Sequence, residues 1–127
     1  MKRNGFLVIE LAVAVTLLAA AMAAWVAMLA FVAANRRAAA DRQLALQEAG
    51  NLMERLTAMP LAELQPDKPP KLALSPEAQR LPGVQSSIEV SRVAGPPKAL
   101  RLAVSLRWED RHGRLAPPVR LVAWRYP

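Results

Sequence analysis

The chain has 127 residues, 54% of them hydrophobic, and a formal net charge of +7 at neutral pH. This length allows one small domain together with a membrane segment. The absence of cysteine excludes disulfide bonds and thiolate metal sites. From Asn35 onward there are 15 basic and 9 acidic residues. Such an excess suits nucleic acid, anionic lipid or an acidic protein as a partner, or simply a surface of solvated arginines.

The N-terminal region combines a short basic leader with a long apolar stretch. Residues 1–5 read MKRNG and contain Lys2 and Arg3, and residues 6–34 contain Glu10 as their one charged residue. Residues 11–34 form a run of 24 residues without a charge, and 18 or more apolar residues are typical of a membrane-spanning helix. As a helix, residues 6–34 would be about 43 Å long, more than a hydrocarbon core of about 30 Å. We therefore expect a transmembrane helix here.

The helical pattern continues through residues 35–59. Apolar residues recur there at spacings of three and four, as on one face of a helix: Ala45, Ala49, Leu52, Met53, Leu56 and Met59. Charged residues, including Glu48, fill much of the other face. Pro60 ends the pattern because proline lacks an N–H donor and clashes with the preceding turn. The sequence predicts an amphipathic continuation of the same helix.

The rest of the chain changes character twice. Residues 60–87 form a proline-rich connection to which we assign no regular structure. Residues 100–109 then alternate strictly between apolar and mostly polar positions, which indicates a strand with one buried face. Weaker strand patterns at residues 88–93 and 119–126 complete an antiparallel meander within residues 88–127. The expected fold class is α+β: a long N-terminal helix, transmembrane in its first half, packed on a small three-stranded antiparallel sheet.

The first ten residues resemble the signal sequence of type IV prepilins and pseudopilins. That motif has a short basic leader, a glycine before the cut, phenylalanine as the first mature residue and glutamate as the fifth. In this chain the leader contains Lys2 and Arg3, and the residue before the cut is Gly5. The first mature residue is Phe6, and the fifth is Glu10. The resemblance implies cleavage between Gly5 and Phe6 by a prepilin peptidase and N-methylation of Phe6.

Glu10 is also a functional candidate on physical grounds. A carboxylate within a membrane helix costs about 2.5–3.5 kcal/mol on insertion scales, so we expect it to find a cation at the same depth. The resemblance supplies one, the N-terminal amine of Phe6 in a neighbouring subunit, which exists only after cleavage. The alternative is that Glu10 extends to the cytoplasmic headgroups, since it lies only one turn from Phe6.

The resemblance also implies a location, a role and a set of partners. We expect a single-pass protein of the bacterial inner membrane with its C-terminal domain in the periplasm, where it can enter a filament. The layout is similar to minor pseudopilins of type II secretion, near the I subfamily, which assemble into or prime a pseudopilus. A minor type IV pilin of the PilV kind, acting in pilus assembly or DNA uptake, is the alternative. The implied partners are other minor and major pilin-like subunits, the prepilin peptidase and inner-membrane lipid.

Two other interpretations of the apolar segment stay open. A conventional secretory signal would be cut after Ala34, where small residues precede the site, but its apolar core would normally be only about 7–15 residues long. A plain signal-anchored membrane protein is the second alternative. Arg36 and Arg37 beyond the span balance Lys2 and Arg3, so charge alone does not fix its orientation.

We expect no enzymatic activity, no cofactor and no bound metal. His112 is the single histidine and lies in a turn-like stretch beside Gly113. The adjacent carboxylates of Glu109 and Asp110 are too few for Ca²⁺, which takes six to eight oxygen ligands.

Two tryptophans near arginines raise the question of nucleic acid. Trp108 and Trp124 stand next to Arg107 and Arg125, a combination that can stack and neutralise single-stranded DNA. We favour packing of the two tryptophans as cross-strand partners in the sheet, and do not expect nucleic acid as a partner.

Overall fold

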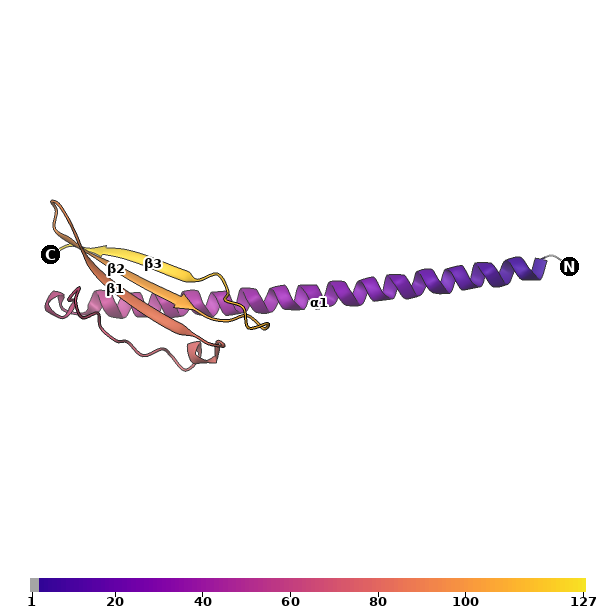
Figure 1. Ribbon diagram of the computed structural model, residues 1–127, viewed down its shortest axis with the longest axis horizontal. Coiled ribbons are helices and arrows are strands. Elements are labelled where there is room, and N and C mark those ends of the chain that lie inside the picture. Colours follow the sequence, from indigo (N-terminus) through magenta and orange to yellow (C-terminus); the bar gives the residue numbers. More distant parts are fainter. Residues whose placement is uncertain (1–2) are drawn as a thin grey trace. The chain divides into compact units, whose positions relative to one another are not determined.

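The structure is a computed structural model that describes residues 3–127. Its elements within this range are helix α1 (Arg3–Ala58), the short 3-10 helices η1 (Leu61–Glu63) and η2 (Ala78–Arg80), and strands β1 (Gln85–Val93), β2 (Ala99–Arg107) and β3 (Val119–Arg125) (Figure 1). The chain divides into two compact units, one ending at Arg37 and one comprising Ala38–Pro127. Each unit is described by itself.

The first unit is entirely helical where it is described. No glycine or proline occurs from Phe6 to Ala49, and alanine and leucine, which favour helices, dominate its apolar stretch. Its large apolar side chains are exposed, among them Phe6 at 73% and Trp25 at 66%. The Thr16 hydroxyl donates to the carbonyl oxygen of Ala12 at 2.7 Å, which satisfies the polar group within its own helix.

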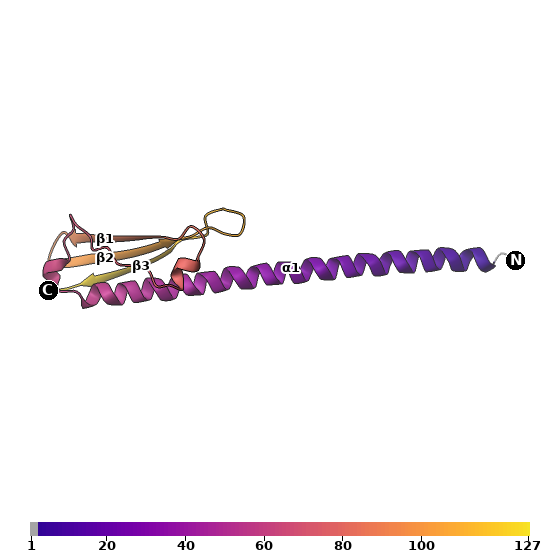
Figure 2. The same cartoon turned by 90° about the horizontal axis from the view of Figure 1, so that it is seen from below.

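The second unit packs the C-terminal part of α1 on an antiparallel sheet. The strand order is β1-β2-β3, and each strand pairs with its neighbour in sequence. Figures 1 and 2 show the sheet lying along this part of the helix. Val104 in the central strand pairs with Ile88 on one side and Leu121 on the other. The predicted fold class, α+β with a helix on a three-stranded sheet, is confirmed.

The core lies between the helix and the central strand. Four helix residues at three- and four-residue spacings are fully buried: Ala45, Ala49, Leu52 and Leu56. They meet the alternate residues of β2, of which Leu102, Val104 and Leu106 are fully buried. Burial of each leucine stabilises the fold by about 1.5–3 kcal/mol.

The helix ends one residue before its predicted end. It stops at Ala58, two residues before Pro60, and Met59 lies outside it. A residue before proline is disfavoured in helical conformation because the proline ring clashes with its backbone, which explains the earlier end.

The connection between helix and sheet is more ordered than expected. Leu64 and Leu81 are buried at 2% and 3% exposure, and Ala78 is fully buried. Strand β1 begins at Gln85, three residues before the predicted start at Ile88. Residues 85–87 are polar and exposed at the edge of the sheet, so no apolar alternation indicates that they pair. The proline-rich connection that we expected at residues 60–87 therefore overlaps the first three residues of β1, and part of it packs against the core.

Glu48 is the other departure from the expected pattern. We assigned it to the polar face of the helix, but it is only 3% exposed. Its two carboxylate oxygens accept hydrogen bonds from the backbone N–H and the hydroxyl of Ser75, at 2.8 and 2.7 Å. The connection thereby supplies the polar partners that a buried carboxylate requires.

Gly83 illustrates how tightly the connection joins the sheet. Its φ of +58° lies in the left-handed region that glycine adopts readily. A Cβ at this position would lie 3.0 Å from Cδ of Glu109. The N–H of Glu109 donates to the carbonyl of Pro82 at 2.8 Å, which holds the end of β2 against the turn.

Candidate functional site

The residues of the leader motif lie at the N-terminal end of α1. Lys2 is outside the described residues, and Arg3 is the first residue of the helix. Gly5 and Phe6 follow within its first turns, so the peptide bond proposed for cleavage lies inside the helix. The Phe6 side chain is 73% exposed and is free to contact lipid or another helix.

Glu10 lies on the same helix face as Phe6. Residues four apart are neighbours on a helix, and the rise between them is about 6 Å. The Glu10 side chain is exposed, and neither of the two ion pairs found among residues 6–127 includes it. If Phe6 became the first residue, Glu10 would lie close to the positive end of the helix dipole, where a carboxylate is favoured. The arrangement leaves this carboxylate available to a cation from outside the chain.

The structure has one helix in its described part that is long and apolar enough to cross a membrane. This helix is α1, which begins close to the N-terminus, and its most apolar stretch of 18 residues is entirely unburied. The unburied apolar surface belongs to the first unit, which has no other element to cover it. This part of the chain is therefore compatible with a single membrane crossing.

The turn between β2 and β3 is organised by Asp110. Its Oδ1 accepts hydrogen bonds from the backbone N–H groups of Arg114 and His112, at 2.9 and 2.8 Å. These bonds, that of Arg114 foremost, lower the pKa of Asp110 below its usual value. His112 is exposed in the same turn. Among the described residues, no three histidine, cysteine, aspartate or glutamate side chains are grouped as metal ligands would be.

The two tryptophans that we expected to pack together lie on opposite faces of the sheet. Trp108 is 3% exposed and follows the core-facing residues of β2. Trp124 is 57% exposed and pairs with Arg101, a position on the other face and at the other end of the strand. The prediction that they are cross-strand partners was wrong, since the strand register separates them. For the same reason they do not form one stacking surface.

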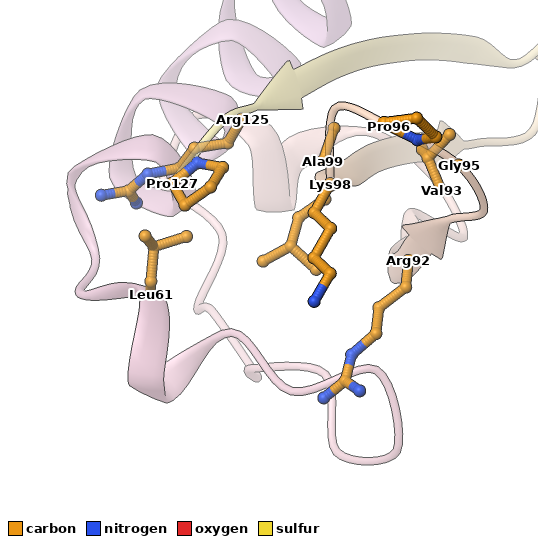
Figure 3. Close-up of a pocket in the computed structure, with 10 residues that line it drawn as sticks. Leu61, Arg92, Val93, Gly95, Pro96, Lys98, Ala99, Arg125 and Pro127 are labelled. Carbon is orange, nitrogen blue, oxygen red and sulfur yellow. The ribbon is translucent and has the colours of Figure 1, made fainter.

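A groove that no pattern in the sequence predicted lies at the far end of the sheet. The strand register aligns Arg92 of β1, Leu100 of β2 and Arg125 of β3 in one row. This row, the hairpin between β1 and β2, and Leu61 of η1 line a groove with a volume of about 730 Å³ (Figure 3). We call it the end groove. The one indication of this groove in the sequence was Pro60, which ends the helical pattern. A helix that stops there leaves the far end of the sheet without a helix to cover it.

The chain was compared with models of known protein families, with curated proteins and with solved structures, and it matches none of them.

Proposed function

We propose that this protein is a membrane-anchored, non-enzymatic pilin-like subunit, a minor pseudopilin that assembles into or primes a type II secretion pseudopilus. The observation that carries the proposal is the leader motif in the first ten residues, joined directly to an apolar helix. Gly5, Phe6 and Glu10 stand at the motif's spacing, after the basic residues Lys2 and Arg3. The motif is short, and its direct junction with an uninterrupted apolar stretch makes it specific.

The proposed mechanism is physical rather than chemical. The subunit is stored with its apolar helix in the inner membrane and its second unit in the periplasm. It is then extracted into a bundle with its neighbours, whose helices cover the apolar surface that the lipid covered before. The exposed side chains from Phe6 to Phe31 support this, because such a surface needs either lipid or other helices around it.

Cleavage would control when subunits associate. The precursor has no amine at Phe6, and removal of residues 1–5 creates one. An α-amine has a pKa of about 7.7–8.0 and is mostly protonated at neutral pH, and methylation keeps it cationic. This cation can pair with Glu10 of a neighbouring subunit. Because Glu10 lies about 6 Å along the helix from Phe6, the pair would set the axial offset between two parallel helices.

A minor type IV pilin would use the same residues in the same way. The uninterrupted helix favours a minor subunit over a fibre-forming one, because many fibre-forming relatives carry a glycine or proline partway along the membrane helix. No such residue occurs here from Phe6 to Ala49. The genes next to this one distinguish the two systems, since secretion and pilus operons encode different outer-membrane and motor components.

Cleavage is the direct test of the proposal. Mass spectrometry of the membrane-purified protein should find Phe6 as the first residue, carrying an N-methyl group. Gly5→Ala should slow processing little, and Gly5→Trp should block it because the peptidase requires a small residue before the cut. An intact leader in cells with an active prepilin peptidase, or an N-terminus at Asn35, would contradict the proposal.

A further inference from the structure

The end groove is the part of the sheet's inner face that α1 does not cover. Arg92, Leu100 and Arg125 share the row that follows the fully buried Leu102, on the same side of the sheet. The helix ends at Ala58, and a guanidinium N–H of Arg125 donates to the carbonyl oxygen of Met59 at this level. The row therefore lies at the edge of the core, where Leu61 of η1, the hairpin between β1 and β2, and Pro127 line the groove with it.

The groove is apolar in its lining and positive in its charge. Leu61 and Val93 are each 38% exposed, and Leu100 is half-buried. Three cationic side chains line it, those of Arg92, Lys98 and Arg125, and no acidic side chain does. Pro127, the last residue, also lines the groove, and even with a terminal carboxylate there the three cations leave an excess of positive charge. Figure 3 shows Arg125 on one side of the groove and Lys98 and Arg92 on the other. Neither ion pair found among residues 6–127 includes any of these three.

We infer that the end groove binds an acidic peptide segment of a partner protein, one that carries apolar side chains between its carboxylates. The cations on the two sides of the groove would pair with the carboxylates, and the exposed parts of Leu100 and Leu61 would receive the apolar side chains. A volume of about 730 Å³ holds a few side chains and falls within the usual range for ligand pockets, about 300–1,000 Å³. This inference goes beyond the proposed function and does not depend on it.

The other possible occupants fit the groove less well. A second copy is disfavoured, because the chain from Asn35 onward carries 15 basic and 9 acidic residues and would repel itself. Single-stranded nucleic acid is held by aromatic side chains on which bases stack, and no aromatic residue lines this groove. A lipid surface is flat, whereas these cations stand on two sides of a concave, apolar site.

Arg92 and Lys98 are the residues to test. Arg125 also donates a hydrogen bond to the carbonyl oxygen of Met59, the residue that follows α1, so replacing Arg125 would disturb the fold. Arg92 lies near the end of an edge strand and Lys98 in the hairpin, and both side chains are exposed. Their replacement should leave the core intact.

The binding experiment uses the full chain in detergent micelles and a short fluorescent peptide in which aspartate and leucine alternate. Fluorescence anisotropy should show binding that weakens as salt is added. Arg92→Glu combined with Lys98→Glu should weaken binding by about tenfold or more, since it replaces two attractions with two repulsions. The matched control is Arg80→Glu combined with Arg107→Glu, which changes the net charge equally at exposed sites outside the groove. Circular dichroism checks that the glutamate double variant is folded. If that variant shows no melting transition, the double variant Arg92→Gln with Lys98→Gln is used in its place.

The contribution of the groove's apolar lining to peptide binding is tested separately. Leu61→Ser should weaken binding of the peptide severalfold, whereas Leu115→Ser, at a side chain 71% exposed outside the groove, should not. A peptide in which serine replaces leucine should bind less well to the parent protein. Equal losses in the groove and control variants would overturn the inference. So would peptide binding that no variant alters, or tighter binding of anionic lipid vesicles or an oligonucleotide than of the peptide.

The experiment also separates this inference from the proposed function. Glu10→Leu should bind the peptide as the parent does, because Glu10 belongs to the first unit and the groove to the second. A protein that is cleaved and assembles but does not bind the peptide would contradict only the inference about the end groove. An uncleaved protein that binds it would overturn only the pilin-like function.

Discussion

Glu48 on the helix and Ser75 in the proline-rich connection are joined by two hydrogen bonds to one carboxylate. The backbone N–H of Ser75 donates to Oε1 at 2.8 Å, and its hydroxyl donates to Oε2 at 2.7 Å. The same hydroxyl accepts a hydrogen bond from the N–H of Ala78 at 3.2 Å, which starts helix η2. A single buried carboxylate thus fixes the connection to the helix across 27 positions of sequence.

Removing either partner should destabilise the second unit. Ser75→Ala leaves the Glu48 carboxylate with only the backbone donor, and Glu48→Gln removes its charge and one acceptor. Each should lower the free energy of unfolding by about 1–3 kcal/mol, the usual cost of an unsatisfied buried polar group. Chemical denaturation of the single and double variants would give the coupling energy of the pair.

Glu54→Gln provides the control for this pair, since Glu54 is an exposed glutamate on the same helix. Its effect should stay within about 0.5 kcal/mol. If Glu48→Gln is as harmless as Glu54→Gln, the carboxylate does not hold the connection.

Leu56 should be essential to the packing of helix on sheet. It is fully buried, at the end of the helix face that covers the strands. Leu56→Ala should cost about 2–5 kcal/mol through lost burial and the cavity left behind, which is enough to unfold so small a unit. Leu46→Ala on the same helix, where the side chain is 39% exposed, should change the melting temperature by only a degree or two. Equal melting of both variants would show that this helix face does not cover the sheet.

Asp110 should make stability depend on pH. Its pKa is lowered in the folded state, chiefly by the backbone N–H of Arg114. Its contribution is therefore present above the pKa of an unfolded aspartate, about 3.9, and is lost as the pH falls through the lower folded value. Asp110→Asn should lower the melting temperature at neutral pH, and the difference should disappear in acid.

Leu115→Ala is the matched control for the turn. Leu115 pairs with Glu109 across the same turn and is 71% exposed, and its side chain does not titrate. Its effect on melting should not vary with pH. A constant difference between Asp110→Asn and the parent across the pH range would mean that the charge of Asp110 contributes nothing to the turn.

Glu10 should act in assembly and not in membrane insertion. Glu10→Leu removes the desolvation cost, so the precursor should insert and accumulate normally. What should be lost is crosslinking to partner subunits in the membrane, together with secretion or piliation by the host. Glu10→Gln keeps the shape and removes the charge, and should fail in the same way.

Thr16→Leu is the control for the membrane segment. The Thr16 hydroxyl is satisfied by Ala12 within its own helix, so its removal should leave crosslinking unchanged. Normal crosslinking and normal function in both Glu10 variants would leave this carboxylate as an interfacial group without a role in assembly.

The sequence by itself determined the long helix, the existence of the three strands and the fold class. Apolar residues at helical spacing up to Leu56, and strict alternation in residues 100–109, are local patterns, and each is readable within a few turns or one strand. The second half of the helix was also the one amphipathic element available to cover the sheet. These features follow from the backbone periods of helix and strand, and they appear in the chain before any long-range contact is known.

Only the tertiary structure decided which polar residues are buried and what meets at the end of the sheet. Glu48 looks like a surface residue until Ser75 is brought to it, and Arg125 reaches Met59 across 66 positions of sequence. Strand register placed Trp108 and Trp124 on opposite faces, and it aligned Arg92, Leu100 and Arg125 in one row. Register and the path of the connection depend on contacts between segments far apart in the chain, which no local pattern contains.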